Sequence, residues 1–480
     1  MRTGITVSTV GFLNQPGRTD ILRCMTLARW TGRVAALLMA AAVFSCLTLV
    51  RAGAAPEDDS TPPGESRSGT KEIRVLIYWC DGAAKTADIV ESLERSNREN
   101  LVPGYRFAVR REYFDAENRL TLEDLSEIDV LVVPGGYLYK FPAAWDRDDV
   151  RAWVGNGGGY VGICGGEIVA IEGEVTGSFF GSYRGLEIAP NIERINPQWV
   201  GERNVRMTSE GTRALGMSGD QRMLHWNGSV MRYRNAPAGE AYVFAVYGGN
   251  GADAENPGHG QDRWNPEWNR SAAILGDTFG RGRLVLSGPH PEFPSEDGKF
   301  QKPRMLGAMV KWAAGDDSPV PFVIGREDRL PARKHSSGLS ALSTVVTADC
   351  VIEELRIYIA GGEGRGVLGI YGDNDRGRPG ALLASVEPFE IEEVNRWYRL
   401  PLKEPLAVSE STTLWLAWMF DRGAFLPTDQ GQHAGDLGSS RTMISTYRWP
   451  EGEEYVLPAA FPEEAAADYR ITGIYATGTP

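Results

Sequence analysis

Gly157-Gly158-Gly159-Tyr160-Val161-Gly162-Ile163-Cys164-Gly165-Gly166-Glu167 is the stretch on which the prediction of the fold rests. Its apolar part predicts a short buried strand over 160–163, and residues 167–171 can open the helix that follows. An exposed side chain on a tight strand-to-helix turn needs small neighbours. Gly162 and Gly166 provide them, in the G-x-C-x-G pattern of a nucleophile elbow. A thiol at a helix N-terminus lies in the positive end of the helix dipole, which favours the thiolate. We therefore predict that Cys164 is a reactive nucleophile; the alternative is a small buried cysteine that only packs.

A second stretch supplies the partners that such a nucleophile requires. It reads Gly280-Arg-Gly-Arg-Leu-Val-Leu-Ser-Gly-Pro-His290-Pro-Glu292 and predicts a strand over 283–287 followed by a loop. A nucleophilic thiol needs a base to take its proton and a carboxylate to orient that base. The chain has only five histidines, so the position of His290 directly after a strand favours it as the base, with Glu292 as the orienting acid. The alternative is a loop histidine capped by a neighbouring acid.

The third motif is a glycine turn that follows an apolar run, Val130-Leu131-Val132-Val133-Pro134-Gly135-Gly136. The run is typical of a strand buried on both faces. The backbone N–H groups of Gly135 or Gly136, together with that of Gly165, form the candidate oxyanion hole. An ordinary turn at the end of a strand is the alternative.

Around these motifs, the pattern from residue 73 to residue 164 alternates between two kinds of element. Strands are predicted over 73–78, 105–110, 130–133 and 160–163, and helical segments over 83–96, 122–125 and 148–154. Such alternation is typical of an α/β domain in which helices cover both faces of a parallel sheet. The carboxyl edge of such a sheet is where ligands bind, and the turn that carries Cys164 lies at such an edge.

The three motifs, in this order on one chain, resemble the class I glutamine amidotransferase-like superfamily. Residues 160–166 and Asn227-Gly228 most resemble the amidotransferase-like N-terminal domain of some biotin-protein ligases. The resemblance covers residues 73–312 and implies a flavodoxin-like, parallel-sheet fold. It also implies the same roles for Cys164, His290 and Glu292, with Gly135, Gly136 and Gly165 around the oxyanion. No biotin-ligase catalytic domain follows and no nucleotide-binding fingerprint stands out. We therefore expect neither biotinylation nor ATP-driven amide transfer, and no cofactor.

Between residues 173 and 280, short apolar runs and turn-rich loops predict a mixed or antiparallel extension. Within it, His225 and Asn227 are candidate substrate contacts; a strand-end turn with a packed tryptophan is the alternative. The loop 248–270 is long enough for a functional lid or a mobile segment. Its acidic residues lack the spacing of a calcium loop, so no metal is predicted.

The two ends of the chain differ from the middle. Residues 1–55 contain arginines, an apolar run over 34–50 and Ala52-Gly53-Ala54, which predicts a signal peptide with an over-long front end and a true start at Met25. An uncleaved membrane anchor is the alternative. We expect a linker over 56–70, the amidotransferase-like domain over 71–323, a second linker over 324–338 and an all-β sandwich over 339–480. Residues 368–380 resemble jelly-roll-like modules of exported bacterial proteins. In this sandwich, Trp415, Trp418 and Trp449 are expected to pack in the core rather than to line a carbohydrate platform.

Cysteine usage and charge limit the function further. Cys80, Cys164 and Cys350 remain after the signal segment, too few for a disulfide scaffold, although a Cys80–Cys164 bridge would silence the nucleophile. The net charge of -13 argues against nucleic acid or an anionic membrane surface as the partner, and a membrane contact is expected only if the signal segment is uncleaved.

Two functions therefore stay open. The first is an exported, periplasmic or extracellular, thiol hydrolase that acts on a small-molecule or peptide amide or a related acyl bond. The second is a non-catalytic binding or scaffold protein with a degenerate amidotransferase-like domain, in which the sandwich binds a glycan or another cell-surface ligand.

Overall fold

The computed structural model describes residues 69–178, 181–195, 199–234, 242–248, 270–293, 301–327, 332–428, 442–448, 455–468 and 474–479. The predicted signal peptide, nearly all of the linker 56–70, the loop 248–270 apart from its two ends, and Trp449 lie outside these residues. Within them, no helix has the length and the apolar character that a membrane crossing requires.

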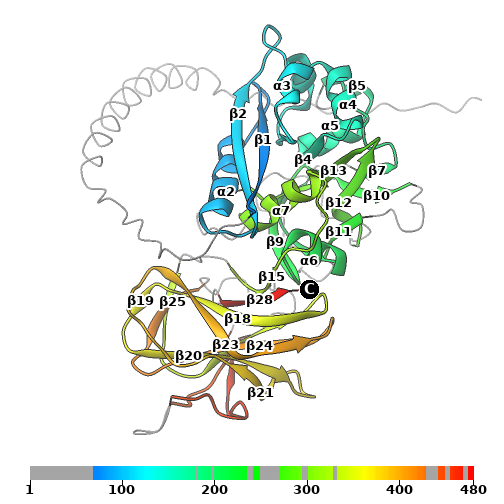
Figure 1. Ribbon diagram of the computed structural model, residues 1–480. Helices are drawn as coiled ribbons and strands as arrows, with labels where there is room; N and C mark the ends of the chain where they lie inside the picture. Colours follow the sequence, from blue (N-terminus) through cyan, green and yellow to red (C-terminus); the bar gives the residue numbers. More distant parts are fainter. Residues whose placement is uncertain are drawn as a thin grey trace, which may run out of the picture. The chain divides into compact units, whose positions relative to one another are not determined.

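In the described residues, the first half of the chain is built on one 12-stranded mixed sheet (Figure 1). Its parallel part has the order β2 (Tyr105–Tyr113), β1 (Lys71–Trp79), β3 (Val130–Val133), β4 (Gly159–Ile163) and β13 (Gly282–Ser287). Antiparallel strands continue from β13, in the order β12 (Ala272–Phe279), β11 (Tyr242–Tyr247), β8 (Val200–Met207), β9 (Asp220–Trp226) and β14 (Pro289–His290). Beside this path, β10 (Val230–Tyr233) pairs with β12 and with β7 (Ile192–Ile195).

A mixed or antiparallel extension was predicted between residues 173 and 280, and the antiparallel strands form one. They continue the parallel sheet directly, because β12 pairs with the parallel strand β13. A short hairpin of β5 (Glu174–Ser178) and β6 (Gly181–Arg184) lies outside the sheet. The described chain is therefore rich in β-structure, with a mixed sheet and few helices.

Side chains of the parallel strands alternate between two hydrophobic layers, because successive residues of a strand point to opposite faces. Along β3, Val130 and Val132 belong to one buried cluster, and Leu131 and Val133 belong to another. Helices α2 (Thr86–Arg98), α6 (Ser209–Leu215) and α7 (Pro303–Ala313) contribute to the first cluster. Helices α3 (Leu122–Ser126), α4 (Arg147–Gly155) and α5 (Gly165–Ile171) contribute to the second. Burial on both faces explains the continuous apolar run in β3.

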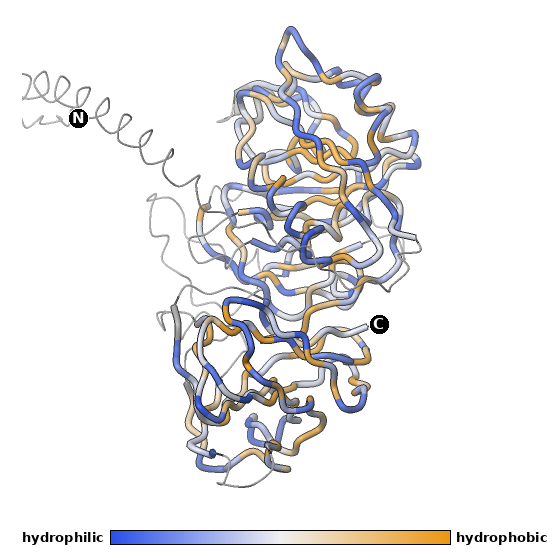
Figure 2. The backbone as a smooth tube through the Cα atoms, turned by 60° about the vertical axis from the view of Figure 1, so that its left-hand side comes forward, coloured by the Kyte–Doolittle hydropathy of each residue, from blue (hydrophilic) through white to orange (hydrophobic). Residues whose placement is uncertain are grey.

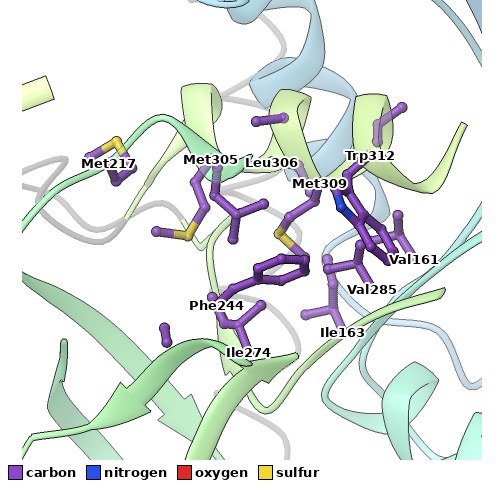
Figure 3. Close-up of a cluster of buried hydrophobic side chains, with 14 of the residues drawn as sticks. Val161, Ile163, Met217, Phe244, Ile274, Val285, Met305, Leu306, Met309 and Trp312 are labelled. Atoms are coloured by element: carbon purple, nitrogen blue, oxygen red, sulfur yellow. The ribbon is translucent and has the colours of Figure 1, made fainter. Parts of the chain in front are cut away.

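Helix α7 is buried over its whole length. Figure 3 shows its side chains against those of β4, β13 and the antiparallel strands. The labelled residues include Met305, Leu306, Met309 and Trp312 of α7 and Val161, Ile163, Val285, Phe244 and Ile274 of the sheet. This helix was not predicted from the sequence, although Pro303 at its first position is a common helix-start signal.

The second half of the described chain consists of antiparallel strands. One sheet has the order β15 (Phe322–Gly325), β28 (Ile474–Thr479), β18 (Cys350–Ile359) and β23 (Arg396–Val408). A larger sheet has the order β21 (Pro379–Ser385), β20 (Arg365–Asp373), β24 (Thr413–Phe420), β17 (Ser340–Val345), β26 (Thr442–Ile444) and β27 (Ala466–Asp468), with β22 (Phe389–Glu390) beside β20. A small sheet has the order β16 (Ala332–Ser336), β25 (Ala424–Thr428) and β19 (Gly361–Gly362). Strand β16 and part of β15 fall in the range 324–338 that the sequence analysis assigned to a linker.

The two larger sheets share one hydrophobic core, which contains Ile352 and Leu355 of β18 and Ile370 of β20. Trp415 and Trp418 are only 1% and 2% exposed. Their indole N–H groups donate to Asp373 Oδ1 at 2.7 Å and to Ser336 Oγ at 3.0 Å, respectively. Both tryptophans therefore pack inside, as predicted. In Figure 2, hydrophobic (orange) and hydrophilic (blue) stretches alternate along the backbone of the described residues.

Three parallel strands end side by side at one edge of the large sheet. The segment after β1 and the turn after β3 hold each other through two backbone hydrogen bonds, from Ala84 N to Gly135 O and from Tyr137 N to Gly82 O, both of 2.8 Å. Cys164 follows β4 at the same edge. This edge carries the candidate site.

Candidate active site

Cys164 occupies the turn between β4 and α5 in a strained backbone conformation. Its φ is 52° and its ψ is -107°, a region that residues other than glycine rarely adopt. A Cβ at Gly162 would lie 2.7 Å from the carbonyl oxygen of Gly166, and a Cβ at Gly166 would lie 2.0 Å from that of Val133. The packing around the turn therefore requires both glycines of the G-x-C-x-G pattern.

His290 and Glu292 form a buried pair near this turn. Nδ1 of His290 lies 2.7 Å from Oε1 of Glu292, and the two residues are 5% and 0% exposed. A Cβ placed on Gly135 would lie 3.0 Å from Cε1 of His290 and 3.4 Å from Sγ of Cys164. The imidazole and the thiol thus both contact the same glycine. The structure brings together all three residues that the sequence analysis selected as a triad.

Backbone contacts fix the loop that carries His290. The N–H of Cys164 donates to the carbonyl oxygen of Ser287 at 2.7 Å, and the hydroxyl of Ser287 donates to the carbonyl oxygen of Pro289 at 2.7 Å. His290 itself pairs with Leu224 of β9. The cysteine turn and the histidine loop are therefore held against each other by the sheet, although 126 residues separate Cys164 from His290 in the sequence.

The thiol of Cys164 donates a hydrogen bond to the carbonyl oxygen of Trp226 at 3.1 Å. Among the described residues, Nε2 of His290 has no hydrogen-bond partner. The arrangement is that of a protonated thiol held by a backbone carbonyl, with a histidine beside it.

The pKa of His290 lies well above its ordinary value, for reasons that can be separated. Burial alone lowers this pKa, but the negative charge of Glu292, and that of the Cys164 sulfur when it is ionised, raise it and outweigh burial. The raised pKa favours the protonated imidazole of His290 beside the Cys164 thiol.

Cys164 and His290 line a pocket of about 320 Å³. The three glycines predicted as the oxyanion hole, Gly135, Gly136 and Gly165, line it as well. Gly165 is the first residue of α5, so its N–H has no acceptor within the helix and is available to a ligand. Gly136 has a φ of 144°, and a Cβ there would lie 2.0 Å from the carbonyl oxygen of Gly82, so only glycine fits.

Several pocket residues were missed by the sequence analysis. They are Asp81, Lys85, Tyr137 and Phe293, which all lie in loops at the carboxyl edge of the sheet. Lys85 Nζ lies 4.6 Å from the centre of the Phe293 ring. Asp81 and Lys85 follow β1, Tyr137 follows Gly136, and Phe293 follows Glu292. These positions at the carboxyl edge of the sheet could have identified them.

The structure separates the two predicted substrate contacts. Asn227 lines the pocket, with a φ of 54° and its N–H donated to the carbonyl oxygen of Trp199 at 3.0 Å. His225 is fully buried and is not among the residues that line the pocket. Burial, with a smaller contribution from the charge of His290, lowers the pKa of His225 to about 3, so it is neutral.

The three described cysteines, Cys80, Cys164 and Cys350, are free thiols. The Cys80–Cys164 bridge is therefore absent from this structure. Burial, assisted by Asp349, raises the pKa of Cys350 to about 11, so this thiol is a poor nucleophile. In the part of the chain that the structure describes, no group of three or more His, Cys, Asp or Glu residues is placed to hold a metal ion.

No protein-family model matches the chain, and no curated protein matches it. Among solved structures, the chain resembles a ThuA-like protein from Bacteroides uniformis, with 12% identity, a TM-score of 0.34, and coverage of 53% of this chain and 95% of the other. A ThuA-like protein from Parabacteroides merdae gives 13% identity, a TM-score of 0.30 and coverage of 51% and 90%.

A third similar structure is a β-galactosidase from Bacillus circulans, with 14% identity, a TM-score of 0.28 and coverage of 72% of this chain. The chain spans 41% of the length of that β-galactosidase. At such identities and TM-scores, none of these likenesses supports an assignment of function, which rests on the site itself.

Proposed function

We propose that this chain is a thiol hydrolase that cleaves an amide or related acyl bond through a thioester on Cys164. One observation carries the proposal: Cys164 on a strained turn, His290 paired with the buried Glu292, and Gly165 are brought together, and Cys164, His290 and Gly165 line one pocket. A strained turn that exposes a nucleophile beside an oriented base is the arrangement that acyl transfer requires.

The chemistry would proceed in two steps. The thiolate of Cys164 attacks the carbonyl carbon, and the oxyanion is stabilised by N–H donors such as that of Gly165, with Gly135 and Gly136 as further candidates. The C–N bond then breaks, His290 gives its proton to the departing amine, and a thioester remains on Cys164. In the second step, water gives a proton to His290 and attacks the thioester, which releases a carboxylic acid and returns the thiolate. Glu292 keeps the imidazole oriented and stabilises its positive charge.

We also propose folds for the two domains, a cellular location for the protein and a ligand for the sandwich. We assign residues 71–323 to a flavodoxin-like, class I glutamine amidotransferase-like domain, supported by the parallel order β2-β1-β3-β4-β13 and by helices on both faces. We assign residues 339–480 to a jelly-roll-like sandwich, supported by the core that its two larger sheets share. Export to the periplasm or the exterior rests on the signal-peptide pattern of residues 1–55. A glycan or another cell-surface molecule is the ligand proposed for the sandwich.

The second candidate, a non-catalytic binding protein, is favoured by one observation. The thiol donates its proton to the carbonyl of Trp226, so in this structure a backbone oxygen and not His290 accepts that proton. If this contact persisted with a ligand bound, the pocket would bind but not cleave.

The test uses p-nitrophenyl acetate, a small activated ester, with the purified protein. The hydrolase proposal predicts a burst of p-nitrophenolate equal to about one equivalent per chain and an acetyl group on Cys164, located by mass spectrometry. The Cys164→Ala variant should lose both signals. Cys350→Ser removes a second buried thiol far from the triad in sequence and should leave them unchanged. A protein that shows no acetylated Cys164 at any pH from 6 to 9 would support the binding protein instead.

A further inference from the structure

A buried polar chain behind the pocket has no role in the mechanism above. The N–H of Ser229 donates to Oε2 of Glu167 at 3.3 Å, and the hydroxyl of Tyr247 donates to the carbonyl oxygen of Ser229 at 3.0 Å. The same hydroxyl lies 2.9 Å from Nδ1 of His225. Because the hydroxyl has only one proton, and gives it to Ser229, His225 must donate from Nδ1. Glu167, His225 and Tyr247 are all 0% exposed.

These hydrogen bonds lead to the turn 226–229. This turn contacts both the segment that carries Cys164 and the loop that carries His290. Its first carbonyl, that of Trp226, accepts the hydrogen bond of the Cys164 thiol. Its third residue packs closely on the histidine loop, because a Cβ at Gly228 would lie 2.0 Å from the carbonyl oxygen of Gly288. Its last residue, Ser229, is bound by Glu167, which lies in the first turn of α5, three residues after the nucleophile.

We propose that Glu167 and Tyr247 are positioning residues that hold the turn 226–229 over Cys164, so that the Trp226 carbonyl orients the thiol and Asn227 stays in the pocket wall. Neither residue touches the pocket directly, since neither lines it. Their effect on turnover rests on the proposed function, whereas their effect on the turn does not.

The surroundings of Glu167 predict that its effect on the turn 226–229 depends on pH. Burial raises the pKa of Glu167 to about 7, against the opposing effects of Arg194 on β7 and of the hydrogen bonds from Ser229, while Glu172 adds to the rise. The other titratable groups that face it are Tyr160 on β4 and Tyr247 on β11, and each carries a raised pKa. Glu167 therefore gains its charge near neutral pH, where the turn and the thiol should respond.

The experiment measures two quantities in the full chain. One is hydrogen exchange of the backbone over residues 224–231. The other is the rate of Cys164 alkylation by iodoacetamide between pH 5.5 and 9. The variants are Glu167→Ala, Glu167→Gln and Tyr247→Phe. The matched control is Tyr371→Phe, which removes a buried hydroxyl that donates to the carbonyl of Pro458 at 2.9 Å in the other half of the chain.

We expect Glu167→Ala and Tyr247→Phe to raise exchange over 226–229 at least about tenfold and to change the alkylation rate at least about threefold. Glu167→Gln should keep the alkylation rate of the wild type at low pH, because its amide oxygen can still accept from Ser229. It should lose the inflection near pH 7. Tyr371→Phe should change neither quantity.

Wild-type exchange over 226–229 in Tyr247→Phe, together with an inflection near pH 7 that persists in Glu167→Gln, would overturn the inference even if Glu167→Ala fails to fold. Both of these variants preserve side-chain shape. Neither readout requires turnover. The experiment can therefore reject the positioning role without rejecting the hydrolase function, and the reverse. A Cys164 that never reacts defeats the hydrolase, and the exchange data then decide the positioning role alone.

Discussion

At the scale of single residues, the absence of a side chain at Gly135 is what allows the thiol and the imidazole to approach each other. In Gly135→Ala, the new Cβ would lie 3.0 Å from Cε1 of His290 and 3.2 Å from Cβ of Cys164, so one of them must move. Because small displacements of catalytic groups are costly, we expect acetylation of Cys164 by p-nitrophenyl acetate to slow by about 10-fold to 100-fold.

The control for this change is Gly155→Ala at the end of α4. There, the new Cβ would meet Phe279, alone among the described residues, at an ordinary 3.6 Å, so the acetylation rate should stay that of the wild type. Equal rates in Gly135→Ala and Gly155→Ala would show that the geometry around Gly135 does not matter for the chemistry.

A second prediction at this scale concerns stability and pH. The pKa of Glu167 is about 7 in the folded chain and 4.5 as an ordinary carboxyl group. A raised pKa means that the folded state holds the proton more tightly, so this contribution to stability is present in full below pH 4.5 and is lost as pH rises to 7. The loss should be on the order of 3 kcal/mol. Residue 167 cannot ionise in Glu167→Gln. The free energy of unfolding of this variant, measured by urea denaturation, should therefore rise relative to that of the wild type between pH 5 and pH 7. An equal difference between the two proteins at both values of pH would contradict the assignment.

At the scale of secondary-structure elements, local patterns predicted some elements well and others poorly. The strand β3 coincides with the predicted range 130–133, and β4 nearly so, because a strand buried on both faces leaves a continuous apolar run. Strands β8 and β9 were not predicted. They carry charged residues such as Arg203 and Arg222, whose burial depends on cross-strand partners that the local sequence does not reveal.

The same distinction applies to the site. Cys164, His290 and Glu292 were found because each lies in a short motif after a strand. The Trp226 carbonyl was not found, since its contact with the thiol depends on the pairing of β9 with β14 and β8. His225 was predicted as a substrate contact together with Asn227, because both lie in the short stretch 224–229. Alternation along β9 instead directs it into the core, where it meets Tyr247.

Helix α7 offers the prediction at this scale. Leu306 is 0% exposed and packs in the cluster of Figure 3, whereas Leu122 at the start of α3 is 46% exposed. Leu306→Ala should lower the free energy of unfolding by about 2–5 kcal/mol, because it leaves a cavity in the core. Leu122→Ala should lower it by less than about 0.5 kcal/mol. Similar losses in both variants, measured by urea denaturation, would mean that α7 does not cover the sheet as described.

At the scale of the whole molecule, free thiols distinguish this chain from a disulfide-stabilised exported protein. In denaturant without reductant, a chain that lacks residues 1–55 should give three equivalents of thiol with Ellman's reagent, from Cys80, Cys164 and Cys350. One equivalent, together with a linked Cys80–Cys164 peptide pair in the mass spectrum, would show that the nucleophile is blocked by oxidation.

We propose that His290 activates Cys164, and the pH dependence of Cys164 alkylation by iodoacetamide measures this activation. A free thiol has a pKa of about 8.5. The wild-type alkylation rate should rise with pH with a midpoint well below that value. His290→Ala removes the imidazolium that favours the thiolate, so its midpoint should move up towards that value and its rate at pH 7 should fall at least about tenfold. A Cys164 that reacts equally in both proteins, or in neither, would contradict the account.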